Sequence, residues 1–185
     1  AGGTVVPLTA TVSSATNDLV PGNNSASAST TVSAAPTVLL TPTGLSVDET
    51  GPTSGTFTVR LSTAPASNVT VALSFPSAQV QVDSGAGFGG SPQTVTLTPA
   101  NALAGVSVVV RAVDDAIDEA SPHAITVVTA STISGEPAFN SLPVSDVAVN
   151  ITDNDSVGVS QVQSAGNTAV TEGGATDSYT LVLTS

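Results

Sequence analysis

Apolar and polar residues alternate one by one along much of this chain, and this pattern predicts β-strands. The clearest examples are residues 56–62, Thr-Phe-Thr-Val-Arg-Leu-Ser, and residues 68–75, Asn-Val-Thr-Val-Ala-Leu-Ser-Phe. Successive side chains of a strand point to opposite faces, so a period of two indicates a strand that is buried on one face and solvated on the other. Further strands of this kind are expected at residues 4–13, 25–32, 79–82, 94–98, 105–113, 124–128 and 146–152.

Turn-forming residues separate these segments. They cluster at residues 63–65, 83–90, 99–101 and 135–137, where Gly, Pro, Asn and Asp interrupt the alternation. The central part of the chain then holds about seven or eight strands at the spacing typical of a sandwich, and no segment has a helical period. We therefore predict an all-β fold made of tandem Ig-like Greek-key antiparallel β-sandwiches.

An internal repeat defines the domain organisation. Val-Asp-Glu-Thr-Gly-Pro-Thr at residues 47–53 is echoed by Val-Thr-Glu-Gly-Gly-Ala-Thr at residues 170–176, and residues 57–62 are echoed by residues 179–184. The period is about 120 residues, which is long enough for a whole domain and too long for one turn of a solenoid. The repeat predicts one complete sandwich and the beginning of a second.

The expected domains are residues 35–155, a complete sandwich, and residues 156–185, the first strands of a following one. Residues 1–34 are expected to be the C-terminal strands of a preceding Ig-like β domain. An isolated hairpin is marginally stable in water, so the two end segments need partners. Two explanations remain open: the chain is a window on a longer protein, or strands of a neighbouring copy complete its ends and make it a filament subunit.

Charge and composition exclude several classes of function. The chain has 14 acidic residues, two basic residues, Arg60 and Arg111, and a net charge of −12. Phosphate binding needs a basic patch, so nucleic acid is not expected as a partner. No apolar run approaches the roughly 20 residues of a membrane-spanning helix, and the first residues lack the pattern of a signal peptide. The absence of cysteine excludes disulfides and thiolate metal sites.

Eight of the fourteen carboxylates lie in three short clusters. The clusters occupy residues 48–49, 114–119 and 153–155, each where a predicted strand ends. A sandwich could bring all three to one pole, and a set of hard oxygen ligands suits calcium. Without a cation, two carboxylates about 4 Å apart repel each other by roughly 4 kcal/mol at an effective dielectric near 20. The alternative is that these are ordinary solvated acids of loops.

The sequence offers no constellation for catalysis. His123 is the only histidine and follows Ser-Pro at the start of a predicted strand, where a surface or turn role is expected. No Gly-x-Ser-x-Gly motif is present, and the glycine-rich residues 85–90 do not open a helix as a phosphate-binding loop would. With no tryptophan and one tyrosine, little is available to stack on a sugar ring. We predict a non-enzymatic protein without catalytic or cofactor-binding residues.

Residues 47–49, Ala-Val-Asp-Asp-Ala-Ile-Asp-Glu at 112–119 and Val-Asn-Ile-Thr-Asp-Asn-Asp at 149–155 resemble the Calx-beta module. This calcium-binding sandwich occurs in sodium/calcium exchangers, integrin β4 and large bacterial exoproteins. The bacterial tandem form is more similar, and the segment 17–32 is similar, more weakly, to the end of another Ig-like bacterial surface repeat. The resemblance implies Ca²⁺ as the cofactor and the following metal ligands: Glu49, Asp114, Asp115, Asp118, Glu119, Asp153 and Asp155. It leaves open whether Asp83 reaches the site.

These observations together predict a structural or adhesive segment of a bacterial surface or secreted repeat protein, in which calcium stiffens the domain array. The expected partners are neighbouring repeats or identical copies, and another cell surface if the role is adhesion. Two alternatives remain, namely a filament subunit assembled by strand exchange and a metal-free spacer.

Overall fold

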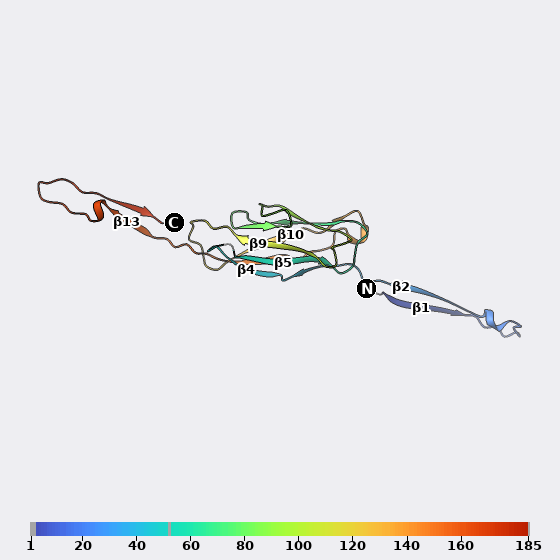
Figure 1. The fold of residues 1–185 in the computed structure, drawn as a ribbon. Coiled ribbons are helices and arrows are strands. Elements are labelled where there is room, and N and C mark those ends of the chain that lie inside the picture. Colours follow the sequence, from blue (N-terminus) through green and yellow to red (C-terminus); the bar gives the residue numbers. More distant parts are fainter. Residues whose placement is uncertain (1–2, 52, 185) are drawn as a thin grey trace. The chain divides into compact units, whose positions relative to one another are not determined.

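The computed structural model describes residues 3–51 and 53–184. It divides into two compact units, Ala1–Pro36 and Thr37–Ser185. Figure 1 shows three parts that follow one another along the chain: a two-stranded hairpin, a sandwich and a second two-stranded hairpin. Helical structure in the described residues is confined to single 3-10 turns.

The first unit is a hairpin of β1 (Thr4–Thr11) and β2 (Ser25–Val32). The strands pair antiparallel over their whole length, from Thr4 opposite Val32 to Thr11 opposite Ser25. A single 3-10 turn, η1 (Pro21–Asn23), lies in the connection. All residues of both strands are exposed.

The first sheet of the sandwich has the order β3-β5-β9-β7, and all its pairs are antiparallel. Its strands are β3 (Val38–Thr41), β5 (Ser54–Leu61), β7 (Val80–Asp83) and β9 (Val106–Ala112). The turn into β9 contains Gly105 at φ +94°, and a Cβ there would lie 2.9 Å from the carbonyl oxygen of Val59. This position therefore requires glycine both for its backbone conformation and for space.

The second sheet places β12 between β4 and β10, and β10 beside β6, which also pairs with β8 and β11. Its strands are β4 (Gly44–Asp48), β6 (Val69–Ser74), β8 (Gln93–Leu97), β10 (His123–Thr129), β11 (Ile133–Ser134) and β12 (Val147–Thr152), with η2 (Pro137–Phe139) between the last two. The strands β4 and β12 pair in parallel, whereas the other pairs are antiparallel. Two packed sheets of mainly antiparallel strands, between which the chain crosses repeatedly, form an Ig-like sandwich.

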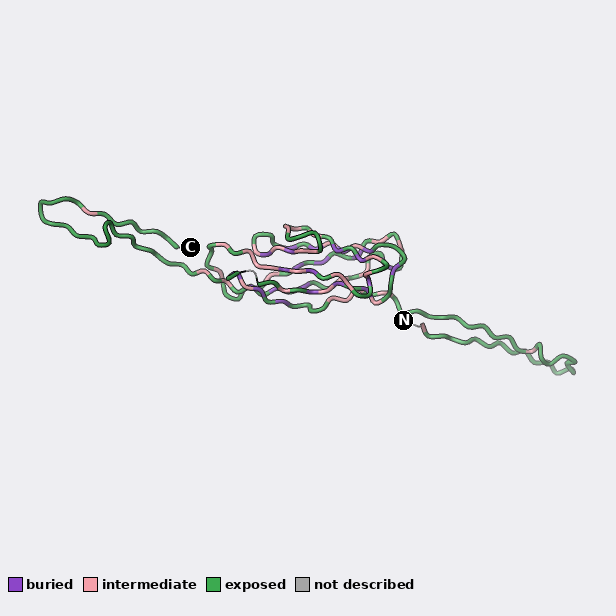
Figure 2. The backbone as a smooth tube through the Cα atoms, in the orientation of Figure 1, coloured by how far each residue is buried: buried purple, intermediate pink, exposed green. Residues whose placement is uncertain are grey.

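The strands β4 to β10 and β12 bury alternate residues between the sheets, whereas β3 and β11 have only half-buried and exposed residues. Phe57, Val59 and Leu61 of β5 are fully buried, and Val149 and Ile151 of β12 are too. Figure 2 shows the buried positions inside the sandwich, while both hairpins are exposed almost throughout. A fully buried side chain of this kind stabilises the fold by about 1.5–3 kcal/mol. The alternation in the sequence thus supplies the core directly.

The last described element pair is a second hairpin, β13 (Val159–Gln163) and β14 (Tyr179–Leu183), with η3 (Ser164–Gly166) in its connection. The strands pair antiparallel from Val159 opposite Leu183 to Gln163 opposite Tyr179. All ten strand residues are exposed.

The predicted all-β, Ig-like fold is confirmed. The strands expected from alternation coincide with β1, β2, β5 to β10 and β12 to within one or two residues at their ends. The strands β3, β4 and β11 were not predicted individually; β3, with the sequence Val-Leu-Leu-Thr, shows no alternation, and β11 has only two residues. Among the described residues, no helix is long and apolar enough to cross a membrane.

Candidate cation-binding site

Parallel pairing of the first and last strands of the second sheet builds one pole of the sandwich. Thr152 stands opposite Asp48 at the end of the ladder, and the backbone N–H of Glu49 donates to the carbonyl of Thr152 at 3.1 Å. Glu49 and Asp153 therefore leave neighbouring strands side by side. The third acidic cluster, residues 114–119, lies in the connection between β9 and β10.

Three carboxylates form the centre of this pole. One carboxylate oxygen each from Glu49, Asp153 and Asp155 lies within 4.8 Å of the others. Two oxygens that each lie about 2.4 Å from one calcium ion are at most about 4.8 Å apart, so this spacing allows a shared ion. The residues present thus fit an oxygen-bound divalent cation.

Burial makes this cluster different from a solvated group of acids. Glu49 is only 3% exposed, and its Oε2 atom has no hydrogen-bond partner. The Oδ2 atom of Asp155 is also buried without a partner. Buried polar atoms in folded proteins are almost always paired, because an unpaired one loses its water without compensation. A cation is the partner that would satisfy both atoms at once.

The pKa values of these carboxyl groups are also raised by their buried, acidic surroundings. Burial, the hydrogen bond with Asp153 and the charges of Asp153, Asp115 and Glu119 together raise the pKa of Glu49 from 4.5 to about 7. Burial also raises the pKa of Asp155, as do, in decreasing order, the charges of its acidic neighbours Asp153, Asp114, Asp115 and Asp118. Each of these causes disfavours the ionised form, and a bound cation would reverse that preference.

The remaining acids of the middle cluster lie around this centre. Asp114 and Asp118 are exposed, and Asp115 is half-buried. Asp114 accepts a hydrogen bond from the Asn154 side chain at 3.2 Å, and Asp118 accepts one from the backbone N–H of Val157 at 3.1 Å. All three are close enough to act on the pKa of Asp155, although they do not belong to the group within 4.8 Å.

Glu119 is held differently from the other predicted ligands. Its Oε1 accepts from the Gln79 side chain at 2.9 Å, and its Oε2 lies 3.1 Å from Nε2 of His123. Its backbone N–H donates to Oδ2 of Asp153 at 3.2 Å. Both carboxylate oxygens are therefore already engaged, and the residue supports the position of Asp153 from outside.

Two expectations need correction or completion here. The sequence assigned His123 a surface or turn role, but its side chain is only 17% exposed and joins the network of Gln79 and Glu119. Asp83, which was left open, accepts hydrogen bonds from the N–H groups of Gly85 and Gly87 at 2.8 Å each and so closes its own loop. The role of His123 has no sequence signature, because Gln79 reaches it only in the folded chain, whereas the partners of Asp83 lie two and four residues further along the chain.

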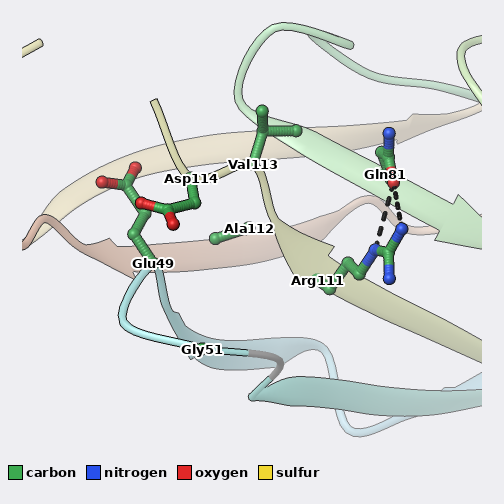
Figure 3. Close-up of a pocket in the computed structure, with 7 residues that line it drawn as sticks. All are labelled: Glu49, Gly51, Gln81, Arg111, Ala112, Val113 and Asp114. Atoms are coloured by element: carbon green, nitrogen blue, oxygen red, sulfur yellow. Dashed lines mark hydrogen bonds between the residues drawn. The ribbon is translucent and has the colours of Figure 1, made fainter. Parts of the chain in front are cut away.

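A shallow pocket of about 320 Å³ adjoins the acidic pole. Figure 3 shows the carboxylates of Glu49 and Asp114 on one side of it and Arg111 on the other. The guanidinium of Arg111 is fixed by two hydrogen bonds to Oε1 of Gln81, at 3.1 and 2.6 Å, and lies 4.1 Å from the centre of the Phe88 ring. Neutral groups therefore orient this positive charge away from the acids.

Comparison with known proteins gives structural neighbours only. No family model matches the chain, and no curated protein matches it in sequence. The apo form of the Calx CBD1 domain has a TM-score of 0.43 at 14% identity, covering 65% of this chain and 98% of that domain. A non-cellulosomal cohesin from the hyperthermophilic archaeon Archaeoglobus fulgidus has a TM-score of 0.42 at 12% identity, covering 65% and 93%.

A third neighbour is the structure of domains 1–6 of the surface layer protein SbsC. The match has a TM-score of 0.36 at 20% identity and covers 89% of this chain but 24% of that one. The neighbours are β-sandwich domains, as this chain is.

Proposed function

We propose that residues 35–155 form a calcium-binding sandwich that serves as a structural or adhesive segment of a cell-surface or secreted repeat protein, as the Calx-beta resemblance implies. One observation carries the cation site: the Oε2 atom of Glu49 is buried without a partner, on a side chain 3% exposed, beside Asp153 and Asp155. A solvated loop acid would have neither this burial nor a pKa near 7.

Calcium is the cation that best fits these ligands. The group offers carboxylate oxygens only, and no described cysteine or histidine belongs to it. Calcium accepts about six to eight oxygens in a flexible arrangement, whereas Mg²⁺ demands a nearly octahedral shell and keeps its waters. Glu49, Asp153 and Asp155 would hold the ion. The neighbouring Asp114, Asp115 and Asp118 would supply further oxygen ligands or stabilise the bound ion through their negative charge. Glu119 would position Asp153.

The site lies where the chain leaves the sandwich, and this location supports a mechanical role. Asp155 is followed after three residues by β13, and the N–H of Val157 donates to the carboxylate of Asp118. A bound ion would tie the end of β12, the connection before β10 and the exit segment together. In this proposal the first hairpin closes a preceding sandwich, and calcium limits the angles between consecutive modules.

Thermal unfolding of the full chain tests the proposal, in chelator and in millimolar calcium or magnesium. If free calcium exceeds its dissociation constant 100-fold, binding should stabilise the sandwich by about 2.7 kcal/mol. The double variant Asp153→Asn, Asp155→Asn should lose this gain. The matched control Asp18→Asn, Glu172→Gln changes two exposed acids and should keep it.

The outcomes separate the alternatives. Equal melting temperatures with and without calcium for the parent chain would favour a metal-free spacer. Light scattering addresses the filament alternative, since a chain that stays monomeric at increasing concentration contradicts assembly by strand exchange. A monomer stabilised by calcium in the parent but not in the double variant is the expected result.

A further inference from the structure

The hairpin of β13 and β14 repeats the strand pairing that opens the complete sandwich. In β3 and β5, Val38 stands opposite Leu61 and Leu40 opposite Val59. In β13 and β14, Val159 stands opposite Leu183 and Gln161 opposite Leu181. Aligning Leu183 with Leu61 therefore aligns both strands without a slip, although the sequence repeat covers only the second strand of each pair.

This register determines which face of the hairpin corresponds to a sandwich core. Tyr179, Leu181 and Leu183 take the places of Phe57, Val59 and Leu61, and all three side chains of the complete sandwich are 0% exposed. In the hairpin the corresponding side chains are 56%, 60% and 75% exposed. A slip of one residue would have put Thr180, Val182 and Thr184 on this face in place of the three large side chains, so the match is specific.

The segment between the two strands is consistent with a missing partner. Residues 47–49 are echoed by residues 170–172, but residues 167–171 form no strand, whereas Gly44–Asp48 form β4. In the complete sandwich β4 exists as a ladder with β12, the last strand. Within residues 156–184 the structure describes no strand that could take the part of β12. A parallel partner for residues 167–171 has to be supplied.

We propose that the face of Tyr179, Leu181, Leu183 and Val159 is one half of a sandwich core, built to be covered by a sheet equivalent to β4-β12-β10-β6-β8. In the complete sandwich the inner side of β5 packs against β4 and β8 of that sheet. The occupant is therefore a segment equivalent to residues 63–155, joined after β14, with alternating branched apolar residues on its inner face. Binding it would also turn residues 167–171 into a strand.

The chain itself provides the test. An extended chain carries a second copy of residues 63–155 in place of Ser185, because Thr184 aligns with Ser62. Tyr179 is the single tyrosine, no tryptophan is present, and the added copy contains neither residue. Intrinsic fluorescence therefore reports on Tyr179 alone. The acrylamide quenching constant should fall several-fold in the extended chain, and the amides of residues 167–171 should gain protection from hydrogen exchange.

Two variants of the extended chain test which face of the hairpin is covered. Leu181→Asn places an amide on the proposed core face and should restore quenching. Val182→Asn is the matched control, since Val182 aligns with the exposed Arg60 and points to the other face. Fluorescence is measured in chelator, so that the outcome is independent of the calcium proposal.

Three results would overturn the inference. Tyr179 as accessible in the extended chain as in the original would mean that the face does not accept this sheet. Equal effects of Leu181→Asn and Val182→Asn would mean that the face is not the one assigned. Concentration-dependent protection of Tyr179 in the original chain would mean that a second copy, not a following segment, covers the face.

Discussion

Replacing Glu49 by glutamine should stabilise the calcium-free chain and weaken its response to calcium. Glu49 is buried against Asp153 and Asp155, and its pKa in the folded chain is about 7 instead of 4.5. Each pKa unit corresponds to about 1.4 kcal/mol. Ionising this carboxyl therefore costs about 3 kcal/mol more in the folded chain than in the unfolded chain. Glutamine keeps the size of the side chain and removes the charge.

The sign of the pH dependence follows from the raised pKa. Below about pH 4.5 Glu49 is protonated in the folded and unfolded chains alike, and the folded chain keeps its full stability. Between about pH 4.5 and pH 7 the unfolded chain ionises this group while the folded chain keeps it protonated, so the folded chain progressively loses up to about 3 kcal/mol; above about pH 7 the loss is constant. In chelator at pH 8, Glu49→Gln should therefore melt roughly 10 °C above the parent chain.

Calcium should reverse this order. The ion replaces the repulsion by attraction in the parent, while the variant offers a neutral ligand and gains less. Melting curves followed by circular dichroism at pH 5 and pH 8, in chelator and in calcium, give all four values. Glu172→Gln is the matched control, because this exposed glutamate is the repeat equivalent of Glu49 and should change neither condition.

A glutamine variant that is no more stable than the parent in chelator at pH 8 would contradict this prediction. In that case the carboxylate would be accommodated without a cation, and the unpaired Oε2 atom would have found water or a proton donor. If the variant is stabilised but still gains as much from calcium as the parent, the carboxylates do repel one another, but Glu49 is not a calcium ligand.

Further predictions concern the fold and the support of the site. Gly105→Ala should destabilise the sandwich by at least about 1 kcal/mol in urea denaturation, because of its positive φ and the nearby carbonyl oxygen, whereas Gly44→Ala, with no atom within 4 Å of the added Cβ, should be nearly neutral. Phe57→Ala should cost about 3–5 kcal/mol in the same assay, since the ring is fully buried between the sheets. Gln79→Ala should lower calcium affinity by about tenfold in isothermal titration without unfolding the chain, because Glu119 loses a donor; an unchanged affinity would contradict the supporting role.

Most of the fold was readable from the sequence because alternate burial is a local property. The sequence of a strand such as β5 shows which of its faces is buried, because Phe57, Val59 and Leu61 alternate with polar residues. The same holds for β6 and β12. The short strands β3 and β4 escaped separate prediction, since pairing with a distant strand and not a long period defines them.

The candidate site, too, was predictable from the sequence only in part. The sequence indicated which carboxylates cluster, and the structure brings Glu49, Asp153 and Asp155 within one ion's reach. The different position of Glu119 could not be read, because its partners Gln79 and His123 come from other strands. The acids of residues 114–119 thus surround or support the centre, whereas the central carboxylates come from the ends of β4 and β12, and no spacing rule in the sequence separates the two kinds.

The sequence by itself determined the strand content, the burial of alternate residues, the strongly negative charge and the repeat between the sandwich and the last hairpin. These are properties of short segments or of composition, and each residue contributes to them whatever its distant neighbours are. Only the tertiary structure decided that β4 lies parallel to β12, that Oε2 of Glu49 is buried without a partner, and that Tyr179 faces solvent where Phe57 is enclosed. Those features depend on which distant segments meet, and burial and electrostatic interaction act through space, not along the chain.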